Sequence, residues 1–185
     1  MGARLLIVCL VAASICACAA TPRSTRMTVD DMEEMGAQMA ASLAKSDAMK
    51  SRQPDSPMWV ITIQKVQNLS SDVMTDGEQW GVMARLQSSL PIRALWDDKN
   101  IRMVVPAERL GSLGKQTRAE FNQPVVRRQP THVMNATFRS ATRADSKNRT
   151  ESYFCLFEII DLKTAVPVWI DKFEYKRAAI GHIWD

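Results

Sequence analysis

Histidine and cysteine, which supply many metal ligands and catalytic nucleophiles, are scarce in this chain. Its 185 residues include two histidines, His132 and His182, and four cysteines. Three of the cysteines lie within the first 18 residues, so only Cys155 would remain in a processed chain. This set has no recognisable metal-ligand spacing. We therefore expect no metal site and no internal disulfide, and we interpret Cys155 as a small buried hydrophobic residue.

Motifs for phosphate binding and hydrolysis are also missing. The segment Gly111–Lys115 lacks the spacing of a phosphate-binding loop, and no Gly-x-Ser-x-Gly string occurs. Carboxylates such as the Asp97–Asp98 pair are interpreted as solvated turn residues, because nothing in the sequence places them in a cleft. We therefore predict a protein that is not an enzyme and that takes no cofactor and no small-molecule substrate.

The chain contains nearly equal numbers of basic and acidic residues. The formal net charge is +4, from 24 basic and 20 acidic residues, and no basic run exceeds the pair Arg127–Arg128. A nucleic-acid-binding domain usually gathers positive charge on one face or along one helix, so we expect no nucleic-acid partner. Hydrophobic residues make up 46% of the chain, which is enough for the core of a single domain.

The N-terminus contains the most specific signal in the sequence. Arg4 precedes the apolar run Leu5–Ile15, which is shorter than the roughly 20 residues that span a bilayer but suits the core of a signal peptide. The string Ile15-Cys16-Ala17-Cys18 resembles the lipobox of bacterial lipoproteins, in which a small residue precedes the modified cysteine. We predict that residues 1–17 are a lipoprotein signal peptide and that Cys18 is acylated, with fatty acids such as palmitate.

Two other fates of the N-terminus are compatible with these residues. Ala17-Cys18-Ala19 also fits an ordinary secretory cleavage site, and an uncleaved membrane anchor is disfavoured by its length. In a lipoprotein, Ala19 after the cysteine favours sorting to the outer membrane, with the domain facing the periplasm. Residues 18–27 would be the lipidated cysteine and a short linker, and nine linker residues reach only about 30 Å. Residues 28–185 are predicted to form one periplasmic domain.

Helical and extended patterns alternate in the first part of this domain. A helix is predicted from Thr28 to about Met49, with acidic residues in its first turns. Its apolar stripe is interpreted as core packing, with an adaptable binding surface as the alternative; the stripe comprises Met32, Met35, Met39 and Leu43. The later elements expected here are a strand at Met58–Val66, a helix opened by the Thr75–Glu78 capping box and interrupted at Pro91, and a strand at Ile101–Val105.

The last third of the chain contains three extended segments. They are predicted at His132–Ala144, Thr150–Leu162 and Pro167–Lys176, joined by connectors of hairpin length. Both faces of the middle segment are apolar, so we expect helices to cover it on each side, whereas the charges of the last segment suggest an edge strand. His132 opens the first segment and is expected to be structural. The fold class is therefore α/β or α+β, with helices packed on a mixed sheet.

Several strings and their order resemble the LpoB-type lipoproteins, which are outer-membrane activators of peptidoglycan synthases. The resemblance covers about residues 28–176. Its most diagnostic part is a strand, then Asp161-Leu162-Lys163-Thr164, and then Val168-Trp169. The strand and turn Ile63–Ser71 and the segment His132–Phe138 follow in the expected order. Ala165 stands where the family usually has glycine, and Asn135 also departs from a typical glycine.

The resemblance implies a sheet of four to five strands with helices on both faces, similar to the N-terminal domain of TolB. It also implies a non-enzymatic function in peptidoglycan synthesis, in which the protein binds and activates a class A penicillin-binding protein. No interface residue can be carried over, because no binding motif of the family is matched residue by residue. A structural or assembly lipoprotein of a secretion or appendage complex is the alternative function, and a secreted hydrolase is a third.

Overall fold

The computed structural model describes residues 25–106, 108–109, 128–145 and 148–180. The predicted signal peptide, Cys18, His182 and most of the stretch from Gly111 to Pro130 lie outside the described residues. Among the described residues, no helix is both long enough and apolar enough to cross a membrane.

Helix α2 runs from Val29 to Lys45 and begins at a complete capping box. The Thr28 hydroxyl accepts from the Asp31 amide, and the Asp31 carboxylate accepts from the Thr28 amide at 2.7 Å. The predicted helix to Met49 is interrupted at Ser46, whose backbone is extended and whose side chain caps the short helix α3, Asp47–Lys50. Serine is a poor interior helix residue and a good cap, which explains why one predicted helix becomes two.

Helix α4, Asp76–Ser89, begins at the predicted capping box of Thr75 and Glu78. It stops before Pro91, and α5, Ile92–Lys99, continues from there. This break is the one expected at proline, which cannot donate the backbone hydrogen bond that a continuous helix would need. Asn100 closes α5 with a left-handed backbone, φ 50°, a conformation that asparagine tolerates better than most residues.

The strands are β1 (Trp59–Ile63), β2 (Gln67–Asn68), β3 (Ile101–Val104), β4 (His132–Ala144), β5 (Asn148–Asp161) and β6 (Pro167–Ile180). They form one six-stranded sheet in the order β3-β1-β4-β5-β6, with β2 beside β4. Strand β1 pairs in parallel with β3 and β4, and β2 pairs in parallel with β4, whereas β5 pairs antiparallel with β4 and β6, so the sheet is mixed. The predicted α+β fold class, the two hairpins and the edge position of β6 are confirmed.

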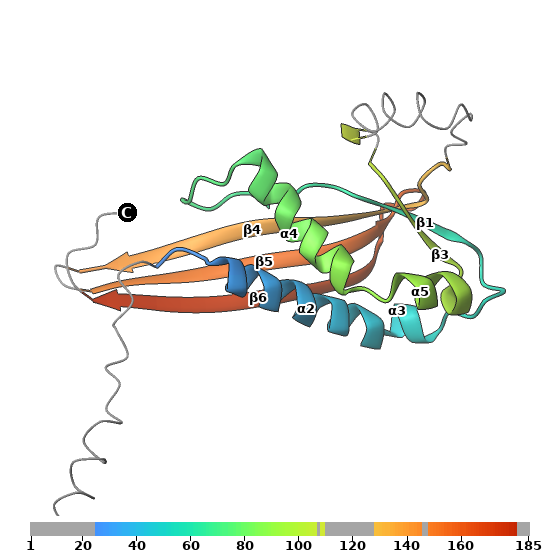
Figure 1. Ribbon diagram of the computed structural model, residues 1–185, viewed down its shortest axis with the longest axis horizontal. Helices are drawn as coiled ribbons and strands as arrows, with labels where there is room; N and C mark the ends of the chain where they lie inside the picture. The colour runs from blue at the N-terminus through green and yellow to red at the C-terminus, as the bar shows by residue number, and fades with distance from the viewer. Residues whose placement is uncertain (1–24, 107, 110–127, 146–147, 181–185) are drawn as a thin grey trace, which may run out of the picture.

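The core lies between the sheet and helices α2 and α4, which cross in front of the long strands in Figure 1. The predicted methionine stripe contributes Met35, Met39 and Leu43, each at most 4% exposed, whereas Met32 is only partly buried. Every second residue of β5 faces this core and is buried, including Tyr153, Cys155, Phe157 and Ile159. The core interpretation of the stripe is therefore confirmed for three of its four residues.

The opposite face of β5 differs from the expectation of a second helical layer. Phe154, Leu156 and Ile160 point to this face and are only half-buried. The described helices α2 and α4 belong to the core on the other face. The sequence led us to expect helices on both faces of β5. Within the described part of the chain, α2 and α4 cover one of these faces. An apolar pattern on both sides of a strand does not by itself say what covers each side.

Candidate protein-binding surface

The described chain begins at one end of the sheet, which we call the proximal end, where β4 ends and β5 begins. Thr25 is fully buried there, and its carbonyl accepts a hydrogen bond of 3.0 Å from the Tyr153 hydroxyl. The Arg177 guanidinium donates to the Arg26 carbonyl at 3.1 Å. Thr25 and Arg26 are therefore held against the proximal end, seven residues after the predicted lipid site.

Polar side chains stabilise the proximal end. The Glu151 side chain is fully buried and accepts from Arg149 at 3.2 Å and from the Thr142 hydroxyl at 2.8 Å. Arg177 also donates to both carboxylate oxygens of Asp31, at 3.1 and 3.2 Å. Burial opposes the charged form of Asp31, but the hydrogen bonds from Thr28 and the charge of Arg177 outweigh it and lower the pKa of that carboxyl. These buried acids are satisfied within the fold, which gives them a structural role.

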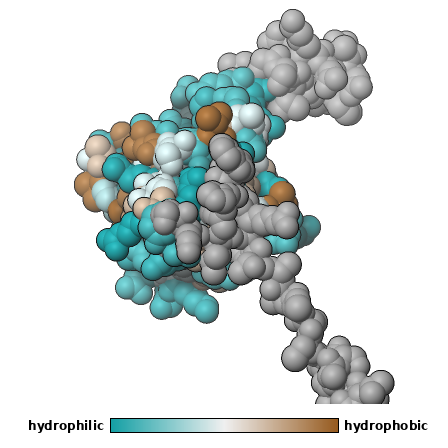
Figure 2. Space-filling view, turned by 90° about the vertical axis from the view of Figure 1, so that its left-hand side faces the viewer, coloured by the Kyte–Doolittle hydropathy of each residue, from teal (hydrophilic) through white to brown (hydrophobic). Residues whose placement is uncertain are grey.

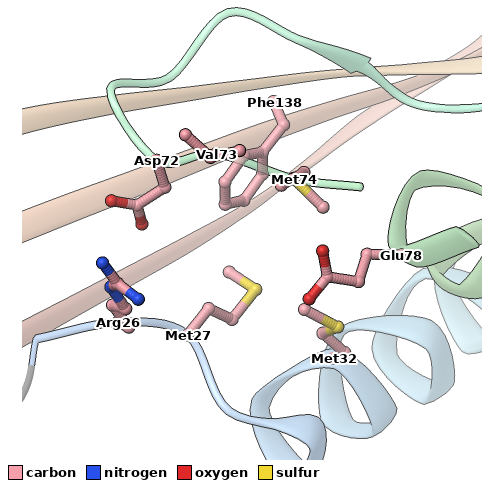
Figure 3. Close-up of a pocket in the computed structure, with 8 residues that line it drawn as sticks. All are labelled: Arg26, Met27, Met32, Asp72, Val73, Met74, Glu78 and Phe138. Atoms are coloured by element: carbon pink, nitrogen blue, oxygen red, sulfur yellow. The ribbon is translucent and has the colours of Figure 1, made fainter. Parts of the chain in front are cut away.

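A small hollow lies beside these residues, between α2, the β2–α4 loop and β4 (Figure 3). Three methionines contribute to its wall, Met27, Met32 and Met74, with the charged groups of Arg26, Asp72 and Glu78 around them. Its volume is about 140 Å³. Small-molecule sites usually enclose roughly 300–1,000 Å³, so this hollow does not have the size of a cofactor site.

Helix α5 lies at the opposite end of the molecule, which we call the distal end (Figure 1). The C-terminal end of this helix is fixed by reciprocal bonds to the α3–β1 loop. Arg52 Nε donates to the Lys99 carbonyl at 2.9 Å, and Lys99 Nζ donates to the Arg52 carbonyl at 2.9 Å. The side-chain amide of Asn100 donates to the Ser56 carbonyl at 3.0 Å. Leu95 is buried in the core, so the rotation of α5 about its axis is also fixed.

This orientation exposes large apolar side chains on the outer face of α5. Trp96 is 54% exposed and Ile92 is 37% exposed, and their i, i+4 spacing places them side by side. The Arg102 guanidinium lies 3.7 Å from the centre of the Trp96 ring, and it donates to the Trp96 carbonyl at 3.0 Å. A shallow depression follows this face, lined by Ile92, Arg93, Trp96 and Asp97. We call Ile92, Trp96 and Arg102 the distal patch.

The composition of the distal patch is typical of a protein interface. Tryptophan and arginine are the residue types most enriched among those that contribute strongly to protein–protein binding. The Trp96 ring is held in place before any partner arrives, because it stacks on the Arg102 guanidinium and belongs to a fixed helix. Such preorganisation lowers the entropy lost on binding.

Among the described residues, Cys155 has the environment of a buried core residue and not that of a nucleophile. Cys155 is 1% exposed, and burial raises the pKa of its thiol far above the ordinary value, so it remains a neutral thiol. It lies between Phe138 and Phe173 on the neighbouring strands. The described residues contain no group of three or more histidine, cysteine, aspartate or glutamate side chains placed to hold a metal ion.

His132 opens β4 as predicted and is 4% exposed. Its Nδ1 lies 2.8 Å from the Thr131 hydroxyl, and its ring centre lies 4.2 Å from that of Trp59. Burial lowers the pKa of the imidazole, and the charge of Arg52 lowers it further, although Asp161 acts in the opposite direction. Its predicted structural role agrees with these contacts.

Sequence reasoning did not single out the distal patch. The sequence predicted a helix interrupted at Pro91, without a role for Trp96, and a strand at Ile101–Val105, without a role for Arg102. The available signal was that Ile92 and Trp96 lie four residues apart while Leu95 takes the inward position. This spacing puts Ile92 and Trp96 on one side of a short helix and Leu95 on another. Only the tertiary fold determines which of these sides faces solvent.

The sequence matches no protein-family model and no curated protein sequence. Similarity appears among solved structures. The LpoB C-terminal domain from Escherichia coli has 12% sequence identity and a TM-score of 0.46, and the one from Salmonella enterica has 10% identity and a TM-score of 0.42; each match covers 78% of this chain and 98% of the other. Lipoprotein GNA1162 from Neisseria meningitidis has 14% identity and a TM-score of 0.38, over 65% of this chain and 83% of that one. The resemblance is one of fold only.

Proposed function

We propose that this chain is an outer-membrane lipoprotein that binds a class A penicillin-binding protein through the distal patch and raises its activity. The observation that carries the proposal is the exposure of Trp96, fixed under Arg102 on α5, at the end of the domain opposite the buried Thr25. The lipobox at Cys18 and the order of LpoB-like strings in the sequence support the envelope location and the class of partner.

The two ends of the domain suit an anchored binding module. With Cys18 acylated, the proximal end is tied to the membrane by a short linker, and the distal patch points away from it. A strand of 14 residues such as β5 spans about 45 Å, and the linker adds up to about 30 Å. The patch thus lies within about 75 Å of its membrane, so a synthase anchored in the opposite membrane has to extend toward it.

The mechanism proposed for activation is a shift in the synthase's conformational equilibrium. A partner that binds one conformation more tightly than another raises the population of the favoured one, and the size of the shift is set by the difference in binding free energy. This role needs no reacting group on the lipoprotein. It requires only a rigid complementary surface, and the fixed α5 provides one.

A pull-down with residues 19–185 tests the proposal. We expect the wild-type domain to retain a class A penicillin-binding protein from solubilised membranes and the Trp96→Ala variant to lose it. Val73→Ala is the matched control, because Val73 is 94% exposed near the proximal end. Equal retention by Trp96→Ala would remove the distal patch from the interface. Recovery of a secretion or appendage component in place of the synthase would overturn the proposed partner.

A further inference from the structure

Three basic side chains form a cluster on the open face of the sheet at the proximal end. Arg139 and Arg143 belong to β4 and Lys176 to β6, and all three are exposed. The strand register places them on one face: Arg139 is in line with Phe154 and Glu174, and Lys176 is in line with Ser152 and Ala141. This face is opposite to the one that packs against α2 and α4. We call Arg139, Arg143 and Lys176 the proximal basic cluster.

The charge of this cluster is not neutralised by the acids around it. Glu174, the acid in line with Arg139, is bound by Lys172 at 2.7 Å. Asp145, in the turn beyond β4, accepts from the Asn148 amide at 2.7 Å. The other cations of this end are already engaged on the helical face, where Arg149 pairs with Glu151 and Arg177 with Asp31. Within the described residues, the three cations of the cluster have no ion-pair partner.

The spacing of the cluster lets the three charges act on one surface together. Four residues along a strand separate Arg139 from Arg143 by about 13 Å, and two strand spacings bring Lys176 about 10 Å across the sheet. These separations are close to the screening length of about 8–10 Å at physiological salt. Arg139 and Lys176 line a shallow depression together with Phe154 and Ser152.

The position of the N-terminal segment decides which partner fits. Thr25 is buried at this same end, although on the helical face of the sheet, so an acylated Cys18 would lie only seven residues from the end that carries the cluster. About seven residues between them reach no further than about 25 Å. Figure 2 looks at this end of the molecule and shows hydrophilic residues over much of the visible surface, with hydrophobic residues gathered at one side. A polar surface with excess positive charge, held this close to a bilayer, faces the phosphate groups of its lipids.

We propose that the proximal basic cluster docks the domain on anionic phospholipid headgroups through the open face of the sheet. The proposal rests on the lipid anchor of the proposed function for its setting, but the contact itself involves only Arg139, Arg143 and Lys176. Each basic residue near an anionic membrane surface strengthens binding about fivefold, so three of them contribute about a hundredfold.

Vesicle sedimentation with the unacylated residues 19–185, which include every described residue, tests the docking directly. We expect binding to vesicles of phosphatidylcholine with phosphatidylglycerol, little binding to phosphatidylcholine alone, and release by salt. Replacing the cluster by Arg139→Gln, Arg143→Gln and Lys176→Gln should weaken binding about a hundredfold, while thermal unfolding stays the same because all three side chains are exposed.

A second triple variant serves as the control. Lys45→Gln, Lys50→Gln and Lys163→Gln remove the same charge from exposed positions at the end of α2, at the end of α3 and in the β5–β6 turn. We expect this variant to bind within about twofold of wild type. Three results would overturn the proposal. The first is equal weakening by both variants, and the second is equal binding to both vesicle types. The third is that the domain binds a column of immobilised acidic protein but does not bind vesicles. Because neither an acyl chain nor a synthase is present, failure here is distinguishable from failure of the proposed function.

Discussion

Ala165 adopts a backbone conformation that suits glycine better. Its φ is 56°, in the left-handed region, and its amide donates to the Asp161 carbonyl at 2.8 Å in the turn between β5 and β6. The Asp161 carboxylate accepts from the amides of Lys163 and Thr164 in the same turn, at 2.7 and 3.3 Å. The turn is therefore fixed by hydrogen bonds and Ala165 is held in a conformation that costs an L-residue about 1–2 kcal/mol.

Ala165→Gly should consequently stabilise the domain, by about 0.5–1 kcal/mol once the greater freedom of glycine in the unfolded chain is subtracted. Urea unfolding checks this value. Ala141→Gly, at an exposed position in β4, should instead destabilise the domain, because glycine weakens a strand. A loss of stability in Ala165→Gly would contradict the strain inferred from its backbone.

His132 gives the stability of the domain a pH dependence near neutrality. Burial lowers the pKa of its imidazole below the unfolded value of about 6.5. The unfolded chain then binds more protons than the folded one. The contribution of His132 to the free energy of unfolding is therefore fully present above about pH 6.5 and is lost as the pH falls below that value. Chemical unfolding between pH 8 and pH 5.5 should show this decline.

His132→Phe tests the origin of that decline. Phenylalanine preserves an aromatic contact with Trp59 but cannot bind a proton, so the variant should have a flatter profile over the same pH range. Asp31 and Asp161, whose pKa values are lowered, contribute only at more acidic pH, where their carboxylates become protonated. An unchanged slope in His132→Phe would assign the pH dependence to another group.

At the scale of elements, the crossing of α2 and α4 depends on Gly36. A Cβ added at Gly36 would lie 3.1 Å from backbone atoms of Arg85 and Leu86 in α4. Backbone atoms cannot move aside as a flexible side chain can, so a larger residue would separate the two helices. Gly36→Leu should destabilise the domain by about 2–3 kcal/mol in thermal or urea unfolding.

Gly77 provides the matched control in α4. The nearest atom to a Cβ added there is the Thr75 hydroxyl at 4.0 Å, which leaves open space. Gly77→Ala should therefore raise stability, by up to about 1 kcal/mol, because alanine favours the helix. If Gly36→Leu were as well tolerated as Gly77→Ala, the helices would not be in the close contact described.

The sequence was informative about elements wherever the determining interactions are local. Thr75 and Glu78 lie three residues apart, Pro91 acts on its own helix, and the β4–β5 and β5–β6 hairpins join neighbouring segments, so each could be predicted. The pairing of β1 between β3 and β4 could not, because it joins residues far apart in the chain. The expected strand at Met58–Val66 is shorter in the structure, where β1 ends at Ile63, and the additional strand β2 follows at Gln67–Asn68. Both pair with β4, which is again distant in the chain.

Part of the candidate site could likewise be predicted from the sequence, and part could not. A lipobox is a contiguous string, so Cys18 could be proposed from sequence alone, and its acylation stays a prediction. The distal patch depends on the packing of Leu95 into the core and on Arg102 reaching back from β3 to Trp96. Neither follows from the order of residues, because both depend on how α5 is rotated against the sheet.

For the whole molecule, the first prediction concerns its anchor. Cys18→Ser should abolish fatty-acid labelling and leave the protein out of the membrane fraction, because the thiol is the proposed acylation site and a single remaining basic cluster binds membranes reversibly. The measurement is metabolic labelling with a fatty acid, followed by fractionation at high salt. Labelling and membrane association that persist in this variant would refute the lipoprotein assignment.

The most direct test of the proposed function measures glycan polymerisation by a purified class A penicillin-binding protein from the same cell. Residues 19–185 should raise the polymerisation rate in a saturable manner. Trp96→Ala should require at least about thirtyfold more protein for the same effect, since truncating a dominant interface residue costs about 2 kcal/mol or more. Val73→Ala should behave as wild type. A synthase whose rate is unchanged at saturating wild-type protein, or is raised equally by Trp96→Ala, would contradict the account.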